Sequence, residues 1–185
     1  MTDFKGKVAV VTGGAQGIGA GIARQMAMLG IKVLIADIDI EMASKTASEI
    51  KHAGSEAEAL KVDVTSYGDL KNMVGEVKNI WGRIDYLVNN AFNAGEATIG
   101  GVNEVSESQW DRDMNALVTS VYAASKYVVP IMADGGGGAI VNISSVHGML
   151  VAKKSLTYET GKAAVIAMTR QMSLDCGEFG IRVNS

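Results

Sequence analysis

Apolar positions along the chain form two alternating patterns, short near-continuous runs and longer segments with helical spacing. Runs such as VAVV, VLIA and AIVNI are typical of parallel strands that are buried on both faces. The pattern predicts strands at residues 7–11, 32–36, 59–62, 84–88, 139–143 and 182–183. Strands that alternate with helices predict an α/β fold, in which a parallel sheet carries helices on both faces.

Two of the segments between the strands show a clear helical stripe of apolar residues. The first stripe consists of Ile18, Ile22, Met26 and Leu29, and the second of Leu70, Met73, Val74, Val77 and Trp81. This spacing places each set on one side of a helix, so both stripes are predicted to be buried against the sheet.

Composition and charge narrow the class of protein. With 185 residues, 48% of them hydrophobic, the chain is long enough for a single domain, residues 1–185, with a sizeable core. No apolar run reaches the roughly 18 residues of a membrane span, and the N-terminus lacks a signal pattern, so a cytoplasmic protein without a membrane partner is expected. The net charge of −3 is spread along the chain, which argues against nucleic acid as a partner.

Cysteine and histidine are scarce. Cys176 is the only cysteine, which excludes an intramolecular disulfide and a cysteine-based metal site. His52 and His147 are the only imidazoles and lie far apart in the sequence, so no metal is expected. His147 follows Ser145 by two residues and either lines a substrate pocket or is a loop histidine without a specific role.

A glycine-rich turn, TGGAQGIG, follows the first predicted strand and leads into a helix. Gly13, Gly17 and Gly19 leave room for the backbone to approach a phosphate, and a helix N-terminus offers unpaired N–H groups to the negative charge. The spacing G-x-x-x-G-x-G differs from the commoner G-x-G-x-x-G dinucleotide fingerprint. The alternative is that these glycines only form a tight turn between strand and helix.

An acidic residue ends the second predicted strand. Asp37 stands where a carboxylate can accept hydrogen bonds from the ribose hydroxyls of a dinucleotide, and it would repel a 2′-phosphate. Neither Gln16 nor Ile38 is a basic residue that could receive such a phosphate. The sequence therefore favours NAD over NADP, unless Asp37 merely caps a loop.

Three tyrosines are each followed four residues later by a lysine: Tyr67 with Lys71, Tyr122 with Lys126, and Tyr158 with Lys162. The spacing alone cannot select one pair, because helix geometry makes any such pair neighbours. The position of a pair along the chain can select it, because ligands of open parallel sheets bind beyond the carboxyl ends of the strands. Ser144 and Ser145 lie at such an end, and Tyr158 follows them. This position favours Tyr158 and Lys162, and the other two are interpreted as solvated helical pairs.

In this order the motifs resemble the short-chain dehydrogenase/reductase family, in its T-G-x-x-x-G-x-G and Y-x-x-x-K branch, over essentially the whole chain. The resemblance implies a Rossmann-like, doubly wound parallel sheet and a homo-oligomer, a dimer or tetramer. It assigns catalytic roles to Asn115, Ser145, Tyr158 and Lys162. It assigns the cofactor site to Gly13, Gln16, Gly17, Ile18, Gly19, Asp37, Asp63, Val64, Asn90, Ala91, Tyr158 and Lys162.

The chemistry that these residues would perform is proton transfer beside a hydride transfer. An ammonium one helical turn from a phenol stabilises the phenolate, so Lys162 would let Tyr158 act as general acid and base. By resemblance, Lys162 also holds the nicotinamide ribose, Ser145 orients the substrate oxygen, and Asn115 holds a water on the proton path. The expected function is an NAD(H)-dependent oxidoreductase that interconverts a secondary alcohol and a ketone of a small molecule, with polyols, hydroxyacyl thioesters and steroids unranked. The alternative is a dinucleotide-binding protein, or a truncated form, without turnover.

The chain departs from the family pattern at three places. Phe92 replaces the glycine that usually follows NNA, and it either presses on the nicotinamide side of the cleft or turns outward, while residues 93–95 hint at a shifted loop. Thr160 and Gly161 replace the usual small residues of the Y-x-A-S-K motif. The chain stops after RVNS, so the final strand and the substrate-loop helices of the family are expected to be absent and the chain to be a fragment.

Overall fold

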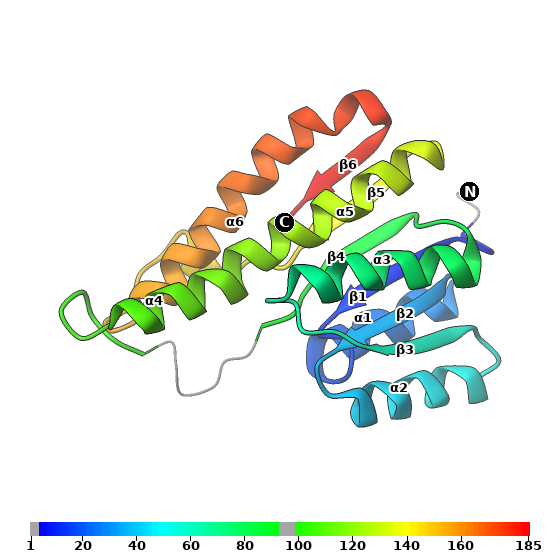
Figure 1. The fold of residues 1–185 in the computed structure, drawn as a ribbon, viewed down its shortest axis with the longest axis horizontal. Helices are drawn as coiled ribbons and strands as arrows, with labels where there is room; N and C mark the ends of the chain where they lie inside the picture. Colours follow the sequence, from blue (N-terminus) through cyan, green and yellow to red (C-terminus); the bar gives the residue numbers. More distant parts are fainter. Residues whose placement is uncertain (1–3, 93–98) are drawn as a thin grey trace.

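The six strands form one parallel sheet in a computed structural model that describes residues 4–92 and 99–185. The strands are β1 (Val8–Thr12), β2 (Lys32–Asp37), β3 (Ala57–Lys61), β4 (Tyr86–Asn89), β5 (Gly138–Asn142) and β6 (Ile181–Asn184). Their order in the sheet is β3-β2-β1-β4-β5-β6, and every neighbouring pair is parallel (Figure 1). The predicted strands are thus confirmed, with ends that differ by a residue or two. Because the strand order reverses between β1 and β4, the crevice for a ligand lies beyond their carboxyl ends.

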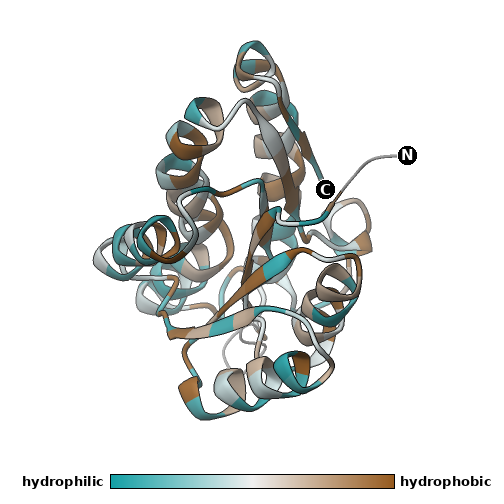
Figure 2. Cartoon of the chain, turned by 90° about the vertical axis from the view of Figure 1, so that its right-hand side faces the viewer, coloured by the Kyte–Doolittle hydropathy of each residue, from teal (hydrophilic) through white to brown (hydrophobic). Residues whose placement is uncertain are grey.

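Helices cover both faces of the sheet. They are α1 (Gly17–Met28), α2 (Ile40–His52), α3 (Tyr67–Trp81), α4 (Glu107–Met114), α5 (Ser120–Asp134) and α6 (Leu156–Asp175), with a π-helical segment η2 (Asn115–Thr119) between α4 and α5. Alternate residues of β1 enter two different cores: Val8 and Val10 pack with α3 and α5, and Ala9 and Val11 pack with α1 and α2. Figure 2 shows the apolar strands enclosed between the helices. The doubly wound α/β fold is confirmed.

The two predicted helical stripes have different outcomes. In α3, Leu70, Met73, Val74 and Val77 are buried as predicted. In α1 the prediction is half right, because Ile22 and Met26 are partly buried and pack against the core, whereas Ile18 and Leu29 are 69% and 57% exposed. The fully buried residues of α1 are glycine and alanine, namely Gly19, Ala20, Ala23 and Ala27. Their small size lets α1 approach the sheet closely.

The helix that runs from Glu107 through η2 to Asp134 is long and apolar enough to cross a membrane by length and composition. Its apolar side belongs to the core of this fold: Val128 and Met132 are fully buried and pack with Leu70 and Met73 of α3. It is therefore interpreted as a core helix.

A buried carboxylate ties β1 to β4 at the amino end of the sheet. Asp85 accepts hydrogen bonds from Val8 N at 2.9 Å, Lys7 Nζ at 3.0 Å, and Arg83 Nε and Nη2 at 2.8 and 2.6 Å. Burial alone would raise the pKa of the Asp85 carboxyl, but these donors together hold that pKa below its ordinary value. The ionised form is therefore stabilised by folding.

Replacing Asp85 by asparagine is expected to lower the free energy of unfolding at pH 7 by about 2 kcal/mol, because the flanking cations lose their partner. For wild type, a lowered folded-state pKa means that the Asp85 contribution is complete above the unfolded carboxyl pKa, about 3.9, and is lost as the pH falls through the folded-state value. Urea unfolding across this range measures both effects. Equal stability of the two proteins at pH 7 would contradict the assignment.

Candidate active site

The glycine-rich turn joins β1 to α1 at the crevice. Gly13 and Gly17 have φ angles of +62° and +57°, which other residues rarely adopt. Among the described residues, no atom lies within 4 Å of a Cβ placed on Gly17, and no side chain caps the helix at Gln16. Gln16, Gly17 and Ile18 are all exposed. The N-terminus of α1 is therefore uncapped and exposed, and its first N–H groups are available to an anionic group.

Asn90 and Thr12 hold this turn in shape. The Asn90 side-chain amide donates to the carbonyls of Thr12 and Gly13, both at 3.0 Å. The backbone N–H groups of Asn90 and Ala91 donate to Thr12 Oγ1 at 3.0 and 3.1 Å. A Cβ on Gly19 would lie 2.1 Å from the Gly13 carbonyl oxygen and 2.6 Å from Asn90 Nδ2. Gly19 is thus required for packing, and the amide of Asn90 supports the turn from behind.

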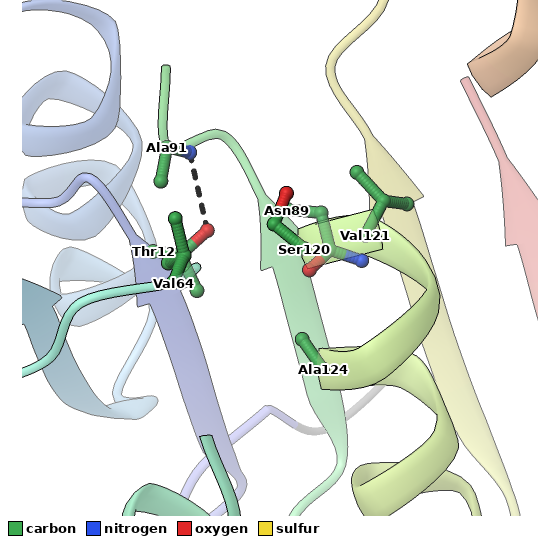
Figure 3. A pocket seen from close by; sticks show the side chains of 7 residues that line it. All are labelled: Thr12, Val64, Asn89, Ala91, Ser120, Val121 and Ala124. Carbon is green, nitrogen blue, oxygen red and sulfur yellow. Dashed lines mark hydrogen bonds between the residues drawn. The ribbon is translucent and has the colours of Figure 1, made fainter. Parts of the chain in front are cut away.

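A small cavity of about 10 Å³ lies between the ends of β1 and β4 and the helix α5 (Figure 3). This volume is at the lower limit for one water molecule. Its lining residues are Thr12, Val64, Asn89, Ala91, Ser120, Val121 and Ala124. Val64 and Ala91, both predicted cofactor contacts, therefore lie at the same edge of the sheet as the glycine-rich turn.

Two carboxylates lie at the ends of the strands on this side. Asp37 ends β2, where Oδ2 accepts from Ala15 N at 2.9 Å and Oδ1 from Asp39 N at 3.1 Å. Asp63 follows β3, where Oδ1 accepts from the N–H and the hydroxyl of Thr65 at 2.9 and 2.7 Å. Each carboxylate oxygen can accept more than one hydrogen bond, so Asp37 fixes the turn and keeps acceptor capacity for a ribose.

Lys162 is the most deeply buried ammonium at the crevice, with 6% of the residue exposed. Its Nζ donates to the carbonyl of Ile143, just after β5, at 2.7 Å. It lies 5.8 Å from the ring centroid of Tyr158 and 5.4 Å from that of Phe92. Burial lowers the pKa of Lys162 by disfavouring the charged form. The carbonyl dipole and the two ring faces offset part of that cost.

The rival Tyr–Lys pairs differ from Tyr158 and Lys162 in the burial of their side chains. Lys126 Nζ lies 5.6 Å from the Tyr122 ring, but that tyrosine is 46% exposed on α5. A hydrogen bond with the Tyr122 hydroxyl raises the pKa of Lys126 above its ordinary value. Tyr67 is exposed at the start of α3. Only Lys162 among the three lysines is removed from water beside its tyrosine.

Ser145 reaches the Tyr158 side of the crevice through His147. Ser145 Oγ accepts a hydrogen bond from His147 N at 3.1 Å, and the His147 ring centroid lies 6.1 Å from that of Tyr158. Ser144 Oγ donates to the Lys162 carbonyl at 2.8 Å. Ser144 therefore attaches the end of β5 to α6 at Lys162, and the adjacent Ser145 is linked to the Tyr158 side by its bond to His147.

Asn115 is oriented differently from the other predicted catalytic residues. It begins the π-helical segment η2, a feature frequent at functional sites. Its side-chain amide donates to the Thr65 carbonyl at 3.3 Å, on the loop before α3. Within residues 4–92 and 99–185, no hydrogen bond joins it to Tyr158 or Lys162. The η2 side chain that contacts α6 is Leu117, which packs against Gly161.

Two contacts of the site escaped the sequence analysis, and a third feature, the orientation of Phe92, was left open by it. Asp113 and Thr157, both buried, form a 2.8 Å hydrogen bond that ties α4 to the first turn of α6. Phe92 turns inward, with its ring centroid 5.2 Å from that of Tyr158, whereas residues 93–95 lie outside the described residues. Glu159 bonds to His147. In the sequence, the polar residues Thr157 and Glu159 on either side of Tyr158 were the available signal for the contacts with Asp113 and His147.

Gly161 is expected to be required by its neighbour Leu117. A Cβ at this position would lie 2.7 Å from both Cβ and Cδ1 of Leu117. Gly161→Ala is therefore expected to destabilise the protein by about 2 kcal/mol, despite the better helix propensity of alanine. The matched control is Gly75→Ala on α3, where no described atom lies within 4 Å and alanine should stabilise by up to about 1 kcal/mol. Urea unfolding compares them, and similar effects at both sites would refute the packing argument.

A family model described as short chain dehydrogenase matches residues 7–185. An uncharacterized oxidoreductase of Thermotoga maritima is 38% identical over 183 residues, which are 99% of this chain and 71% of that protein. A 2,5-dichloro-2,5-cyclohexadiene-1,4-diol dehydrogenase of Sphingobium indicum is 35% identical over 180 residues, which are 97% of this chain and 71% of the relative.

Solved structures agree with these relatives. An NAD+-bound xylitol dehydrogenase matches with a TM-score of 0.93 and 31% identity, over 99% of this chain and 70% of that one. A 7 alpha-hydroxysteroid dehydrogenase complexed with NADH and 7-oxo glycochenodeoxycholic acid matches with a TM-score of 0.93 and 32% identity, over 98% of this chain and 69% of that one.

Proposed function

The chain belongs to the short-chain dehydrogenase family of oxidoreductases, and we propose that residues 1–185 form one dinucleotide-binding domain that uses NAD(H) to interconvert a secondary alcohol and a ketone. The observation that carries the proposal is the buried ammonium of Lys162 beside the Tyr158 ring, at the carboxyl end of β5. A buried cation beside a phenol favours the phenolate, which is the form that accepts a proton from an alcohol.

In the proposed reaction each residue has a separate task. Tyr158 takes the hydroxyl proton of the alcohol, or returns it to the ketone, and Lys162 stabilises the phenolate. Ser145, whose Oγ already accepts from His147 N, has its own hydroxyl proton free to donate to the substrate oxygen. NAD, when bound, supplies the hydride acceptor. The open N-terminus of α1 binds its phosphates.

The proposal assigns no step of the proton transfer to Asn115. Its amide is engaged by Thr65, and the α6-facing residue of η2 is the apolar Leu117. The proposal therefore places the proton transfer on Tyr158, Lys162 and Ser145.

The proposal also includes self-association of the chain, in which the helices α5 and α6 form the contact between subunits.

The proposed preference for NAD depends on Asp37, whose charge would repel a 2′-phosphate. The matched xylitol dehydrogenase is bound to NAD+ and the matched hydroxysteroid dehydrogenase to NADH, which supports the same choice. Asp37→Asn keeps an acceptor oxygen for Ala15 N but removes the charge, so it is expected to reduce the preference for NADH over NADPH at least about ten-fold. Fluorescence titration with both cofactors measures this. Asp39→Asn is the control, because Asp39 only caps α2.

The proposed activity itself is tested by supplying NAD+ with a panel of secondary alcohols, including cyclic diols, polyols and hydroxysteroids, and recording NADH formation. Oxidation of at least one of them is expected. NADH binding in titrations without turnover on the whole panel would favour a binding role over catalysis.

A further inference from the structure

We propose that Glu159 is a positioning residue that acts through His147 on Ser145 and on the loop between β5 and α6, an inference that rests on the proposed function. Glu159 follows Tyr158 directly in the first turn of α6. Its Oε1 accepts hydrogen bonds from His147 Nδ1, at 2.9 Å, and from the backbone N–H of Ala152. One carboxylate oxygen thus joins two points of the loop to the helix that carries Tyr158.

Burial distinguishes this pair from a surface contact. The Glu159 side chain is 12% exposed and that of His147 is 40% exposed. A carboxylate so far removed from water loses hydration, and the two N–H donors replace it. The pair therefore has a fixed geometry, which solvated pairs of long side chains lack.

In the middle of the loop, the backbone packs on α6 at Gly148, where an added Cβ would lie 2.6 Å from Ile166 Cδ1, but the larger side chains of the loop do not share this packing. Its four large apolar side chains, Val146, Met149, Leu150 and Val151, are exposed. Its far end is attached to the segment before α4 by Lys154, whose Nζ bonds to Glu104 at 3.0 Å and whose carbonyl accepts from Gly100 N at 2.8 Å. Between these attachments, Glu159 is the side-chain anchor that holds the apolar rim beside Tyr158.

The pair also sets the proton positions of its neighbours. A carboxylate only accepts hydrogen bonds, so a neutral His147 must carry its proton on Nδ1. Among the described residues, none is hydrogen-bonded to Nε2, which therefore carries a free lone pair beside Tyr158. The backbone N–H of His147 occupies an acceptor site of Ser145 Oγ. Through His147, Glu159 thus orients the Ser145 hydroxyl as a donor toward the substrate oxygen.

The tautomer gives a readout that does not depend on catalysis. The chain has two histidines, so a His52→Gln background leaves His147 as the single imidazole for nitrogen NMR. Neutral His147 is expected as the Nδ1–H tautomer, and Glu159→Ala is expected to shift it to the Nε2–H form that free histidine prefers. An Nε2–H tautomer in the protein with Glu159 intact would overturn the inference.

Loop anchoring is measured by limited trypsin cleavage after the exposed residues Lys153 and Lys154. Glu159→Ala is expected to accelerate this cleavage about ten-fold, because a charge-assisted anchor is lost. Glu159→Gln keeps an acceptor oxygen for both N–H groups and is expected to stay within about three-fold of wild type. Equal cleavage rates for Glu159→Ala and wild type would also overturn the inference that Glu159 anchors the loop.

Turnover separates positioning from folding. Glu159→Ala is expected to lower kcat about ten-fold with unchanged NADH affinity, and Glu159→Gln to recover most of that loss. If wild type oxidises an alcohol and Glu159→Ala does so equally well, the positioning role is wrong while the proposed function stands. If wild type turns over no substrate, the proposed function fails, and the tautomer and cleavage rates still decide whether Glu159 fixes His147 and the loop.

Discussion

Replacing Tyr158 by phenylalanine is expected to lower kcat about a thousand-fold on any alcohol that the wild-type protein oxidises, because general acid–base catalysis typically contributes between about a hundred-fold and ten-thousand-fold. The substitution removes only the hydroxyl. The contacts of the ring with the Phe92 ring and with Lys162 Nζ, at 5.2 and 5.8 Å, should persist. NADH affinity is therefore expected to change by less than about three-fold.

Tyr122→Phe is the matched control for this experiment. It removes the same hydroxyl from a tyrosine that also has a lysine ammonium within 6 Å of its ring, at 5.6 Å, but on an exposed helix face. Turnover should be unaffected there. Steady-state kinetics and NADH titrations of Tyr158→Phe and Tyr122→Phe test this prediction. A Tyr158→Phe protein that retains wild-type kcat would remove Tyr158 from the mechanism.

Replacing Gly19 by alanine is expected to produce the second large effect, a loss of dinucleotide binding. The added Cβ would lie 2.1 Å from the Gly13 carbonyl oxygen, a backbone atom that cannot move without deforming the turn. We expect a destabilisation of about 3 kcal/mol and NADH affinity weaker by about a hundred-fold, since the phosphate-facing N–H groups would be displaced. Urea unfolding and fluorescence titration measure the two effects.

Gly21→Ala supplies the control on the same helix. Among the described residues, no atom lies within 4 Å of a Cβ at Gly21, so alanine there should stabilise α1 by up to about 1 kcal/mol through helix propensity and leave NADH binding intact. If Gly19→Ala binds NADH as well as Gly21→Ala does, the turn is not the phosphate site.

Prediction from sequence succeeded where a local pattern has one physical solution. The apolar runs VAVV and VLIA became the buried strands β1 and β2, because a continuous apolar segment of that length between turns is typically covered on both sides. The run AIVNI also became a strand, β5, but its Val141 is 38% exposed. Asp37 was correctly placed at the end of β2, since the strand ends where the apolar run does.

The stripe predicted for α1 was only half right, because periodicity identifies a helix but not which of its residues come closest to the sheet. Ile22 and Met26 pack against the core but stay partly exposed, whereas the smaller Ala23 and Ala27 allow a closer approach and are buried. Hydropathy undervalues alanine and glycine, whose contribution here is the absence of bulk.

The details of the catalytic neighbourhood depended on contacts between distant segments. Phe92 had two open orientations, and its approach to Tyr158 follows from how the end of β4 meets α6. The contact of Leu117 with Gly161 was not predicted, because the π-helical segment η2 that carries Leu117 leaves no mark in the spacing of apolar residues. Glu159 and His147 meet only because the loop folds back over α6.

A secondary alcohol with deuterium on its carbinol carbon, oxidised in the presence of NAD+ and analysed by mass spectrometry of the cofactor, tests the central claim most directly. The account predicts that the deuterium appears in NADH with the wild-type protein and that the labelled cofactor is formed about a thousand-fold more slowly with Tyr158→Phe. Cofactor that binds the protein but never acquires the label, with every alcohol supplied, would contradict it.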